Sequence, residues 1–583
     1  MLHTLTRSLR ENKGPALVTV LLSALEVVFE IVIPLFMSNL IDFGIEGGSM
    51  AAVWKFGAFL LLLAAFQLAT GVLAARIAAR ASVGFAANLR EDMYDNVQTF
   101  AFSNIDKFST ASIVTRLTTD TTNVQNAFQM LMRMAIRSPV MLVFSMIVSF
   151  RISRDISMTF LVILPILALA LFFIIRSVFP VFSRVFRTYD ELNNVVQENV
   201  RGIRVVKSFN QERHEIGKFG AISERIYKDF SKGERLITLN APLMQFCIYT
   251  CMIVISWLGA KAIIASGNDP AFGLTTGNLT ALITYTMQIL SSLMMLSMVF
   301  AMLTISLSSA RRIAEVLEER TDIPQPAQPV MTVRDGAVDF DHVSFVYASK
   351  ADKKVLDDID LHIRSGETIG VIGGTGASKS SLVQLIPRLY DVTGGKLTLG
   401  GVDVRDYDLD TLRGAVAMVL QKNELFSGTI AENLRWGNEN ATDEQLRHAC
   451  KLACADGFIS AMPDGYDTHI EQGGTNVSGG QKQRLCIARA LLKKPKVLIL
   501  DDSTSAVDTR TDAQIQQALS TYIPDTTKII IAQRISSVQN ADRIVVLDDG
   551  HIDAVGSHDE LLRTCEIYRE VYESQQKGGE DDA

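Results

Sequence analysis

The sequence is poor in cysteine, and its cysteines do not have the spacing of a metal-binding or redox motif. Six occur among 583 residues. Cys247 and Cys251 are four residues apart, as are Cys450 and Cys454, so each pair can share a helix face without forming a CxxC motif. We interpret these residues as small buried hydrophobes and reduced thiols, a usage that fits a cytoplasmic domain better than a metal site.

A positive net charge and a cleavable leader are missing as well. The formal net charge is −7, which gives no support for the basic surface of a nucleic-acid binder, so no nucleic-acid partner is expected. The first residues, MLHTLTRSLRENKGP, are basic but lack the short apolar core and the cleavage site of a signal peptide. We expect them to form a surface helix at the cytoplasmic face of a membrane.

Hydrophobic residues are abundant but unevenly distributed. They make up 48% of the sequence, while 20% of the residues are charged. Nearly all long apolar runs precede residue 310 or so, and the dense charge follows it. Because the chain also exceeds the usual length of one domain, it is predicted to be multidomain, with a membrane-embedded part followed by a soluble part.

Six apolar stretches are long enough to cross a bilayer as helices. They run over residues 16–41, 54–75, 134–150, 156–175, 241–265 and 279–307. The third stretch is the shortest, and it is preceded by Arg133 and interrupted near its start by Arg137. The sequence therefore predicts a six-helix all-α transmembrane domain within residues 1–320, in contact with the lipid bilayer.

Two long polar connections separate these stretches, over residues 76–133 and 176–240. Both are rich in Arg and Lys, which favours the cytoplasmic side, and both show helix-like patterns. We expect the spanning helices to continue as long cytoplasmic helical extensions that form two hairpins. Their tips, near residues 109–116 and 209–213, are expected to contact the soluble domain, and solvated loops are the alternative.

Beyond Arg311 the composition changes to that of a linker and then of a soluble domain. The proline-rich segment TDIPQPAQPV predicts an extended linker over residues 321–336. The apolar runs ETIGVIG, AVAMVL, KVLILDD, TKIIIAQ and RIVVLDD then alternate with helical patterns, as buried strands of an α/β domain do. This domain is expected over residues 337–573, and the polar tail over residues 574–583 is expected to be disordered.

A glycine-rich segment, GGTGASKSS at residues 373–381, joins one of these strands to a helical pattern. Backbone N–H groups and a lysine at such a junction can hold a phosphate. The segment follows the pattern G-x-x-x-x-G-K-[ST] except that Ser378 replaces the second glycine, and a structural turn is the alternative when it is considered alone. We expect Lys379 at the β- and γ-phosphates and Ser380 on Mg²⁺. The remaining predicted ATP contacts are Gly373, Gly374, Thr375, Gly376, Ala377, Ser378 and Ser381.

A second motif, VSGGQKQRLCIARALL at residues 477–492, resembles the signature of ATP-binding-cassette (ABC) proteins. Asp501 ends an apolar strand, where a carboxylate can hold magnesium. With the six predicted spans, the chain resembles an ABC exporter half-transporter, which implies an α/β P-loop nucleotide-binding domain that uses ATP and Mg²⁺. The resemblance places Gln421 beside Mg²⁺, Tyr347 against adenine, and Ser505 and Asp508 in the loop that contacts the opposite cassette.

Two residues depart from the family pattern at the catalytic centre. Asp502 stands where the family has a glutamate that polarises the attacking water, and Gln533 stands at the position of the switch histidine. Aspartate is one methylene shorter, and glutamine can donate a hydrogen bond but cannot become a cation or shuttle a proton at neutral pH. Because a displacement of about 1 Å can cost about 100-fold in rate, we expect Asp502, Gln533 and Gln421 to form an impaired catalytic set. Neutral variation within an active ATPase is the alternative.

The intact signature implies a partner subunit. In this family, two cassettes hold ATP between the P-loop of one chain and the signature of the other. Ser478, Gly479, Gly480 and Gln481 match the signature, so this chain is expected to complete the active site of a similar half-transporter whose own catalytic residues are consensus. The chain resembles the degenerate-site subunit of heterodimeric bacterial multidrug exporters.

The resemblance implies ATP-driven export of lipophilic or drug-like small molecules across the plasma membrane. Both termini and the nucleotide-binding domain are expected in the cytoplasm. Import of a bulky chelate and a regulatory, non-transporting role are the alternatives, because these motifs do not encode the direction of transport.

Two carboxylates lie inside the first predicted span. Glu26 and Glu30 share a helix face and lie roughly 15 and 21 Å into the membrane at 1.5 Å per residue. Charged groups at that depth usually face a polar cavity or an ionic partner. We consider two interpretations equally: a pathway that favours cationic or amphipathic solutes, and an interhelical packing pair.

Overall fold

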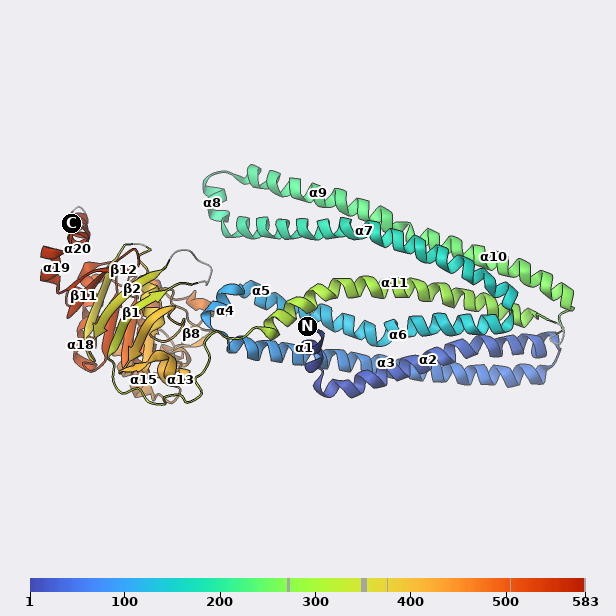
Figure 1. The fold of residues 1–583 in the computed structure, drawn as a ribbon, viewed down its shortest axis with the longest axis horizontal. Coiled ribbons are helices and arrows are strands. Elements are labelled where there is room, and N and C mark those ends of the chain that lie inside the picture. Colours follow the sequence, from blue (N-terminus) through green and yellow to red (C-terminus); the bar gives the residue numbers. More distant parts are fainter. Residues whose placement is uncertain (270–272, 348–353, 375, 504, 581–583) are drawn as a thin grey trace. The chain divides into compact units, whose positions relative to one another are not determined.

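The computed structural model describes residues 1–269, 273–347, 354–374, 376–503 and 505–580. Its contacts divide the chain into two compact units. The first, called the helical unit here, contains Met1–Gln98 and Thr110–Glu319. The second, called the α/β unit, contains Thr99–Ser109 and Arg320–Ala583. Figure 1 shows both units.

The helical unit contains six helical stretches that are long and apolar enough to span a membrane, within the residues that the structure describes. This confirms the predicted six-helix arrangement. The stretches are Arg10–Glu46, Met50–Gln98, Thr110–Ile152, Arg154–Arg201, Glu212–Ser266 and Thr276–Glu318. Their main helices are α2 (Lys13–Asn39), α3 (Met50–Gln98), α6 (Thr121–Ile152), α7 (Arg154–Arg201), α9 (Glu212–Thr238), α10 (Asn240–Ser266) and α11 (Thr276–Glu318), with the short helices α1 (Leu2–Arg7), α5 (Thr110–Thr115) and α8 (Ile203–Ser208).

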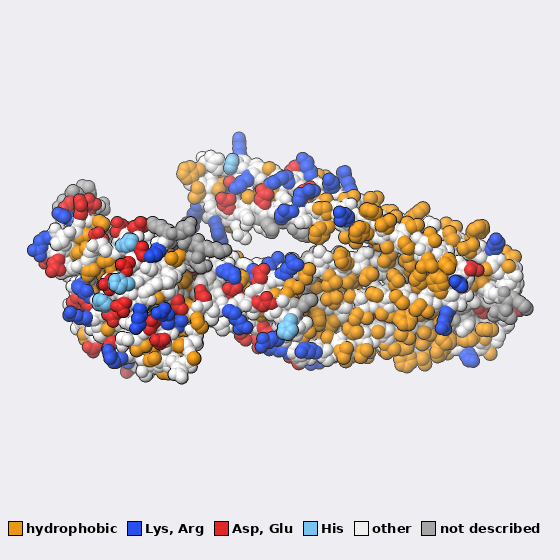
Figure 2. Space-filling view, in the orientation of Figure 1, with side chains coloured by type: hydrophobic (Ala, Val, Ile, Leu, Met, Phe, Trp, Pro, Cys, Tyr) orange, Lys and Arg blue, Asp and Glu red, His pale blue; other side chains and the backbone are white. Residues whose placement is uncertain are grey.

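Several of these helices extend well beyond their apolar segments. Helix α3 has 49 residues and α7 has 48, more than twice the length that a bilayer requires. Figure 2 shows hydrophobic side chains along one end of the long helices and charged side chains along the other, where α7 and α9 approach α8. The two long polar connections are therefore helical extensions of the spans, as predicted.

Helices α2, α3, α6 and α11 pack together, and α7 packs against α9 and α10 (Figure 1). Small side chains allow close approach: Ala74, Ala78 and Ala81 of α3 are completely buried. In the polar extension, Arg116 forms an ion pair of 3.0 Å with Glu315, which connects the π-helical turn Arg116–Asp120, just before α6, to α11. These contacts fix the helices that surround the carboxylates of α2.

The α/β unit is built on a six-stranded sheet in the order β12-β11-β3-β10-β9-β6. All five predicted strands lie in it, and all run parallel: β3 (Thr368–Gly373), β6 (Val416–Val419), β9 (Val497–Asp501), β10 (Thr527–Ile531) and β11 (Arg543–Asp548). Strand β12 (His551–Gly556) adds an antiparallel edge. This sheet confirms the predicted α/β class.

A second sheet, antiparallel and in the order β2-β1-β4-β5, was not expected from the sequence. Its strands are β1 (Val338–Phe345), β2 (Leu356–Ile363), β4 (Gly394–Leu399) and β5 (Val402–Asp403), and a small ribbon pairs β7 (Gly428–Thr429) with β8 (His469–Ile470). Buried residues alternate with partly buried or exposed ones along much of β1 and β2, so these strands lack the continuous apolar runs of the parallel sheet.

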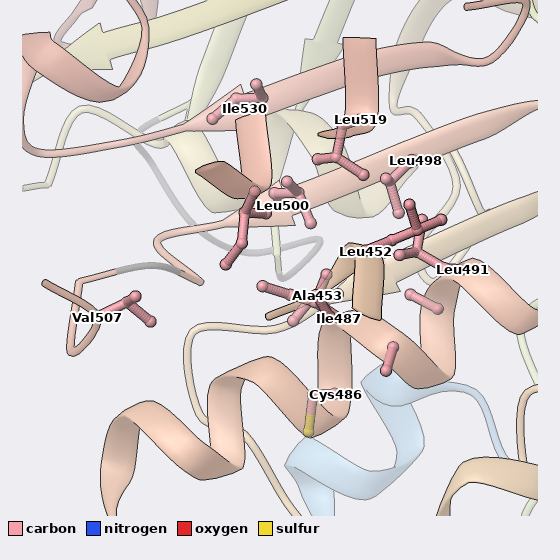
Figure 3. Close-up of a cluster of buried hydrophobic side chains, with 14 of the residues drawn as sticks. Leu452, Ala453, Cys486, Ile487, Leu491, Leu498, Leu500, Val507, Leu519 and Ile530 are labelled. Atoms are coloured by element: carbon pink, nitrogen blue, oxygen red, sulfur yellow. The ribbon is translucent and has the colours of Figure 1, made fainter. Parts of the chain in front are cut away.

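Helices cover one face of the parallel sheet. Figure 3 shows Leu498 and Leu500 of β9 in a buried cluster with Ile487 and Leu491 of α17 (Gly479–Leu492). The alternate residues of β9, such as Ile499, belong to a second cluster shared with the antiparallel sheet. The other helices of the unit are α4 (Phe102–Lys107), α12 (Lys379–Leu385), α13 (Leu409–Ala415), α14 (Ile430–Arg435), α15 (Asp443–Leu452), α16 (Asp456–Ser460), α18 (Thr509–Tyr522), α19 (His558–Thr564) and α20 (Glu566–Glu580).

The unit boundaries differ from the expected ones at two places. Residues Thr99–Ser109 belong to the α/β unit, because the Tyr390 hydroxyl donates to Asp106 at 2.8 Å and the Phe102 ring contacts Tyr390. Helix α4, just before the expected contact residues 109–116, is therefore part of the α/β unit. Helix α20 runs through Glu580, beyond the expected start of a disordered tail at residue 574, and its apolar residues up to Tyr572 pack on the core.

Candidate nucleotide-binding site

The predicted phosphate loop connects β3 to α12. The Lys379 ammonium donates to the carbonyl oxygens of Gly373 and Gly374 at 2.8 Å each, so the lysine side chain folds back over its own loop. Gly376 has φ +89°, and the buried Ala377 completes the turn into α12. Thr375 lies outside the described residues. A lysine above a glycine-rich junction of strand and helix is the arrangement that binds nucleotide phosphates.

Ser378 adopts a left-handed conformation, with φ +67° and ψ +20°. This is the position at which the P-loop pattern has glycine. For a residue with a Cβ, that conformation costs about 1–2 kcal/mol. The chain therefore keeps the loop geometry of the motif even though the residue does not favour it.

Asp501 and Ser380 lie together beside Lys379. Asp501 ends β9, is 3% exposed and accepts a hydrogen bond from Ser380. Burial raises the pKa of the Asp501 carboxyl, the charge of Asp502 raises it further, and Ser380 and Lys379 act in the opposite direction. Burial lowers the pKa of Lys379, although both aspartates oppose this shift. A hydroxyl and a carboxylate are the hard oxygen donors that Mg²⁺ prefers, so this pair fits the metal of a nucleotide complex.

The three residues predicted to form the catalytic set converge on one oxygen atom. Gln533 Nε2 donates to Asp502 Oδ2 at 2.9 Å, and Gln421 Nε2 lies 3.5 Å from the same oxygen. Burial raises the pKa of Asp502, while both amide contacts act to lower it. A carboxylate oxygen that already accepts from two amides is less available to polarise water.

Tyr347, the predicted adenine contact, lies on the rim of this site. Its ring is 44% exposed, and its hydroxyl is 2.7 Å from Ser381 Oγ. It also contacts the ring of Tyr390 edge-on, with ring centroids 5.1 Å apart. Through Tyr390 the predicted adenine contact is connected to Asp106 of α4.

The signature residues form the start of α17. Ser478 is the N-cap of this helix, and its side chain and that of Gln481 bond reciprocally to each other's backbone N–H. A Cβ at Gly480 would lie 2.8 Å from the Ala506 carbonyl oxygen, whereas one at Gly479 would meet only the Ala506 Cβ, at 3.4 Å. Gly480 is therefore required for packing within this chain, and Gly479 is not.

A buried glutamine connects the signature helix to the predicted dimer loop. Gln483, 5% exposed, accepts from the Ala506 N–H at 3.0 Å and donates to Ser505 Oγ at 3.3 Å. Ser505 in turn donates to the Asp502 carbonyl at 3.0 Å, and Asp508 caps α18. Sequence reasoning missed the role of Gln483, although it lies inside the signature motif.

The membrane carboxylates face a basic residue that the sequence had shown only as an interruption. Arg137 of α6 donates to Glu26 at 2.8 Å and to Glu30 at 2.6 Å. Together with Arg133, these residues line a cavity of about 380 Å³. Four methionines also line it: Met134, Met141, Met287 and Met295. Both of the alternative interpretations are represented here, an interhelical ion pair and a polar cavity.

Comparisons with known proteins agree with this assembly of units and motifs. The chain matches the ABC transporter transmembrane region over residues 16–294 and the ABC transporter family over residues 356–505. It is 35% identical over 561 residues to YfiB of Bacillus subtilis (strain 168), described as an uncharacterized ABC transporter ATP-binding protein, and covers 96% of each chain. A Mycobacterium tuberculosis (strain CDC 1551 / Oshkosh) protein described in the same terms is 33% identical over 580 residues, covering 99% of this chain and 98% of that protein.

The same fold occurs in a solved structure of a bacterial Atm1-family ABC exporter with ATP bound. That structure aligns with a TM-score of 0.82 and 23% sequence identity, covering 97% of this chain and 99% of the exporter. The sequence relatives and the two matched regions together extend over both units. The chain belongs to the ABC transporter family, as a half-transporter with one transmembrane domain and one nucleotide-binding cassette.

Proposed function

We propose that this chain is the weakly hydrolytic subunit of a heterodimeric exporter of lipophilic or drug-like molecules. Its own P-loop binds Mg²⁺-ATP, and its signature completes the catalytic site of a similar half-transporter. The observation that carries this proposal is the convergence of Gln421 and Gln533 on Asp502 Oδ2. The shortened carboxylate is held by amides at the place where the family has a glutamate that polarises water.

The phosphate loop supports the proposal that this chain binds Mg²⁺-ATP. Lys379, Ser380 and Asp501 keep the charge and the oxygen donors for phosphate and Mg²⁺, while Tyr347 offers an exposed aromatic face for a base. Hydrolysis needs an additional group that places water in line with the γ-phosphate. A site that keeps its phosphate and Mg²⁺ ligands, but whose water-placing residues are altered, binds nucleotide better than it cleaves it.

The signature supports the proposal that this chain completes the catalytic site of a second subunit. Ser478 and Gly479 are exposed at the start of a well-capped helix, and nothing within the chain requires Gly479 to be glycine. A glycine there is explained by close approach of a nucleotide held by a second cassette. The predicted dimer loop, connected to the signature by Gln483, belongs to the same surface.

The second helical hairpin also carries apolar side chains that suit contact with another subunit. Val205, Phe209 and Ile216, at and beside α8, are each at least 60% exposed. Val205 belongs to α8, Phe209 ends it, and Ile216 lies in the first turns of α9. This polar end of the hairpin is a place where lipid does not account for exposed apolar residues. We propose that they contact the partner half-transporter on the cytoplasmic side of the plasma membrane, where both termini also lie.

The cavity between α2, α6 and α11 is the proposed substrate site. Methionine side chains adapt to apolar molecules of different shape, and the carboxylates offer charge to a cationic group. Arg137 satisfies one oxygen of each carboxylate, and Glu26 Oε2 is buried without a hydrogen-bond partner among the described residues. An amphipathic cation is therefore the substrate class that we propose.

The experiment that tests this function compares the chain alone with the chain and its partner. The purified chain should bind ATP, lose about tenfold to 100-fold in affinity on Lys379→Ala, and show little turnover. The heterodimer in vesicles should export cationic amphipaths when ATP is supplied on the cassette side. Uptake in the opposite direction would indicate an importer, ATP binding without transport would indicate a regulator, and robust turnover by the chain alone would contradict the proposal.

A further inference from the structure

Helix α20 packs firmly on the α/β unit, close to the loop that carries Gln533. Tyr568 is completely buried, and its hydroxyl lies 2.8 Å from His558 Nδ1. The His558 ring also contacts Tyr572 edge-on, with ring centroids 5.3 Å apart. Ile567 and Val571 add apolar contacts to the main core cluster. The helix is therefore held in place along its first two turns.

The next turn of α20 brings Gln575 to the loop after β10. Its side-chain Nε2 donates to the Gln533 carbonyl oxygen at 2.8 Å, and its Oε1 accepts from the Ile535 N–H at 2.9 Å. One amide thus satisfies an acceptor and a donor two residues apart, as a neighbouring strand would. The loop is held at the backbone on both sides of Arg534.

The two hydrogen bonds from Gln575, called the Gln575 contact here, hold the residue that faces the catalytic carboxylate. Gln533 has its backbone bound to Gln575 and its side chain bound to Asp502 Oδ2 at 2.9 Å. Gln533 is exposed, so burial contributes little to holding its side chain over Asp502. Its position follows from its backbone, and its backbone is held from α20.

We propose that Gln575 is a positioning residue that fixes Gln533 for contact with the γ-phosphate of bound ATP. The inference rests on the proposed function only in taking this cassette as an ATP-binding one. Gln575 touches neither nucleotide nor Asp502, and its effect passes through the Gln533 backbone. It therefore acts on ATP, which has a γ-phosphate, and leaves binding of ADP unchanged.

The adjacent Gln576 provides a matched control. It has the same side chain one residue later on the same helix, but its Nε2 donates to the Tyr572 hydroxyl and not to the loop. Gln575→Ala and Gln576→Ala therefore remove the same side-chain volume and change helix propensity in the same way. Only the first releases the Gln533 backbone.

The test measures ATP and ADP affinity of the purified full chain with Mg²⁺. Gln575→Ala should lower the preference for ATP over ADP about threefold to tenfold, the loss expected when a hydrogen-bonded position becomes free. Gln575→Glu should lower it at least as much, because a carboxylate oxygen would face the Gln533 carbonyl oxygen. Gln576→Ala should leave it unchanged.

The same substitution in a Gln533→Ala variant distinguishes a positioning effect from a nonspecific loss of nucleotide affinity. In a Gln533→Ala chain, adding Gln575→Ala should not change the ATP preference further, because the side chain being positioned is absent. An equal loss of ATP and ADP affinity, an unchanged ATP preference, or an additive loss in the Gln533→Ala background would each overturn the inference. Lys379→Ala is measured in parallel. If Lys379→Ala leaves ATP affinity unchanged, the proposed nucleotide site is wrong. If Lys379→Ala lowers ATP affinity but Gln575→Ala does not change the preference for ATP over ADP, only the proposed role of Gln575 is wrong.

Discussion

Two surfaces of this cassette differ in how well their residues suit their conformations. The phosphate face comprises residues 373–381 with Asp501 and Asp502, and the signature face comprises residues 478–481. On the phosphate face, Ser378 adopts a left-handed conformation that favours glycine, and Asp502 accepts from two glutamine amides. On the signature face, Ser478 and Gln481 form a reciprocal cap, and Gly480 makes a close approach that only glycine permits. The residues on the signature face, which we propose completes the partner's site, therefore suit their conformations better than those on the phosphate face.

The same contrast explains why one chain can retain both faces. In the proposed heterodimer, ATP bound at the phosphate face would join the two cassettes whether or not it is hydrolysed, so binding residues there would keep a role after catalytic ones are altered. The signature would contribute to a different ATP molecule and would be constrained by that site.

The largest expected effect comes from the signature. In the assembled heterodimer, Ser478→Ala with Gly479→Asp should lower ATPase activity at least about 100-fold, because donors to a developing phosphate charge are lost at the hydrolysing site. Steady-state phosphate release is the measurement. Position 479 is chosen because its Cβ meets only Ala506 Cβ at 3.4 Å, so the chain itself should fold normally.

Asp502→Asn in the same heterodimer is the matched comparison. It should retain most of the activity, because in the proposed heterodimer this carboxylate is not the base of the hydrolysing site. Both complexes are compared at equal ATP occupancy, since a signature change can also weaken cassette closure. The assignment of the two faces is reversed if Asp502→Asn abolishes turnover while the signature variant stays near normal.

Restoring the family residues should produce the next largest effect. The purified chain with Asp502→Glu and Gln533→His should hydrolyse ATP about tenfold faster or more, because a longer carboxylate and a titratable imidazole are returned to the γ-phosphate. The gain should disappear when Lys379→Ala is added. If the unaltered chain already turns over as fast as the restored one, the substitutions are neutral variation.

The parallel sheet and the motifs at its strand ends could be predicted because each strand is a continuous apolar run. Strand β9 is buried along its whole length, so its hydrophobicity identifies it without knowledge of its neighbours. Strands β1 and β2 alternate charged and apolar residues, and their pairing depends on residues far apart in the sequence. Local patterns therefore revealed one sheet and not the other.

The site residues divide in the same way. Lys379, Asp501 and Ser478 lie in contiguous motifs, so sequence alone identified them. Gln575 lies 42 residues from Gln533 in a tail that had been expected to be disordered, and no local pattern marks an amide that bridges two backbone groups. Arg137 was noticed as an interruption of a span, but only the packing of α6 against α2 shows that it pairs with Glu26 and Glu30.

The membrane cavity offers a smaller effect that sharpens the proposed substrate class. Replacing both carboxylates would leave Arg137 without a counterion, which destabilises a partly buried site. Glu30→Gln alone preserves the Arg137–Glu26 ion pair of 2.8 Å. It should slow transport of a cationic amphipath about threefold to tenfold, because a charged hydrogen bond contributes about 1.5–3 kcal/mol and only part of it acts on the substrate.

A neutral amphipath of similar size is the internal control and should change less than twofold, a limit of about 0.4 kcal/mol. Ser291→Ala, another change in the wall of the same cavity, tests whether any loss of a polar group has this effect. Equal slowing of cationic and neutral substrates, at normal expression, would leave the carboxylates as a packing pair.

The smallest expected effect is on stability, and it tests the conformational cost of the phosphate loop directly. Ser378→Gly should stabilise the chain by about 0.5–1 kcal/mol, because it removes a left-handed penalty of about 1–2 kcal/mol and adds an unfolded-state entropy cost of about 0.4–1 kcal/mol. The measurement is the thermal midpoint of the purified chain without nucleotide.

Ser520→Gly is the matched control, since Ser520 is an exposed residue in the regular helix α18, where glycine should lower stability by about 0.5 kcal/mol. Opposite shifts of the two midpoints would identify strain at Ser378 as the cause. Shifts in the same direction would mean that glycine acts in both places through the unfolded chain, and that Ser378 fits its loop without strain.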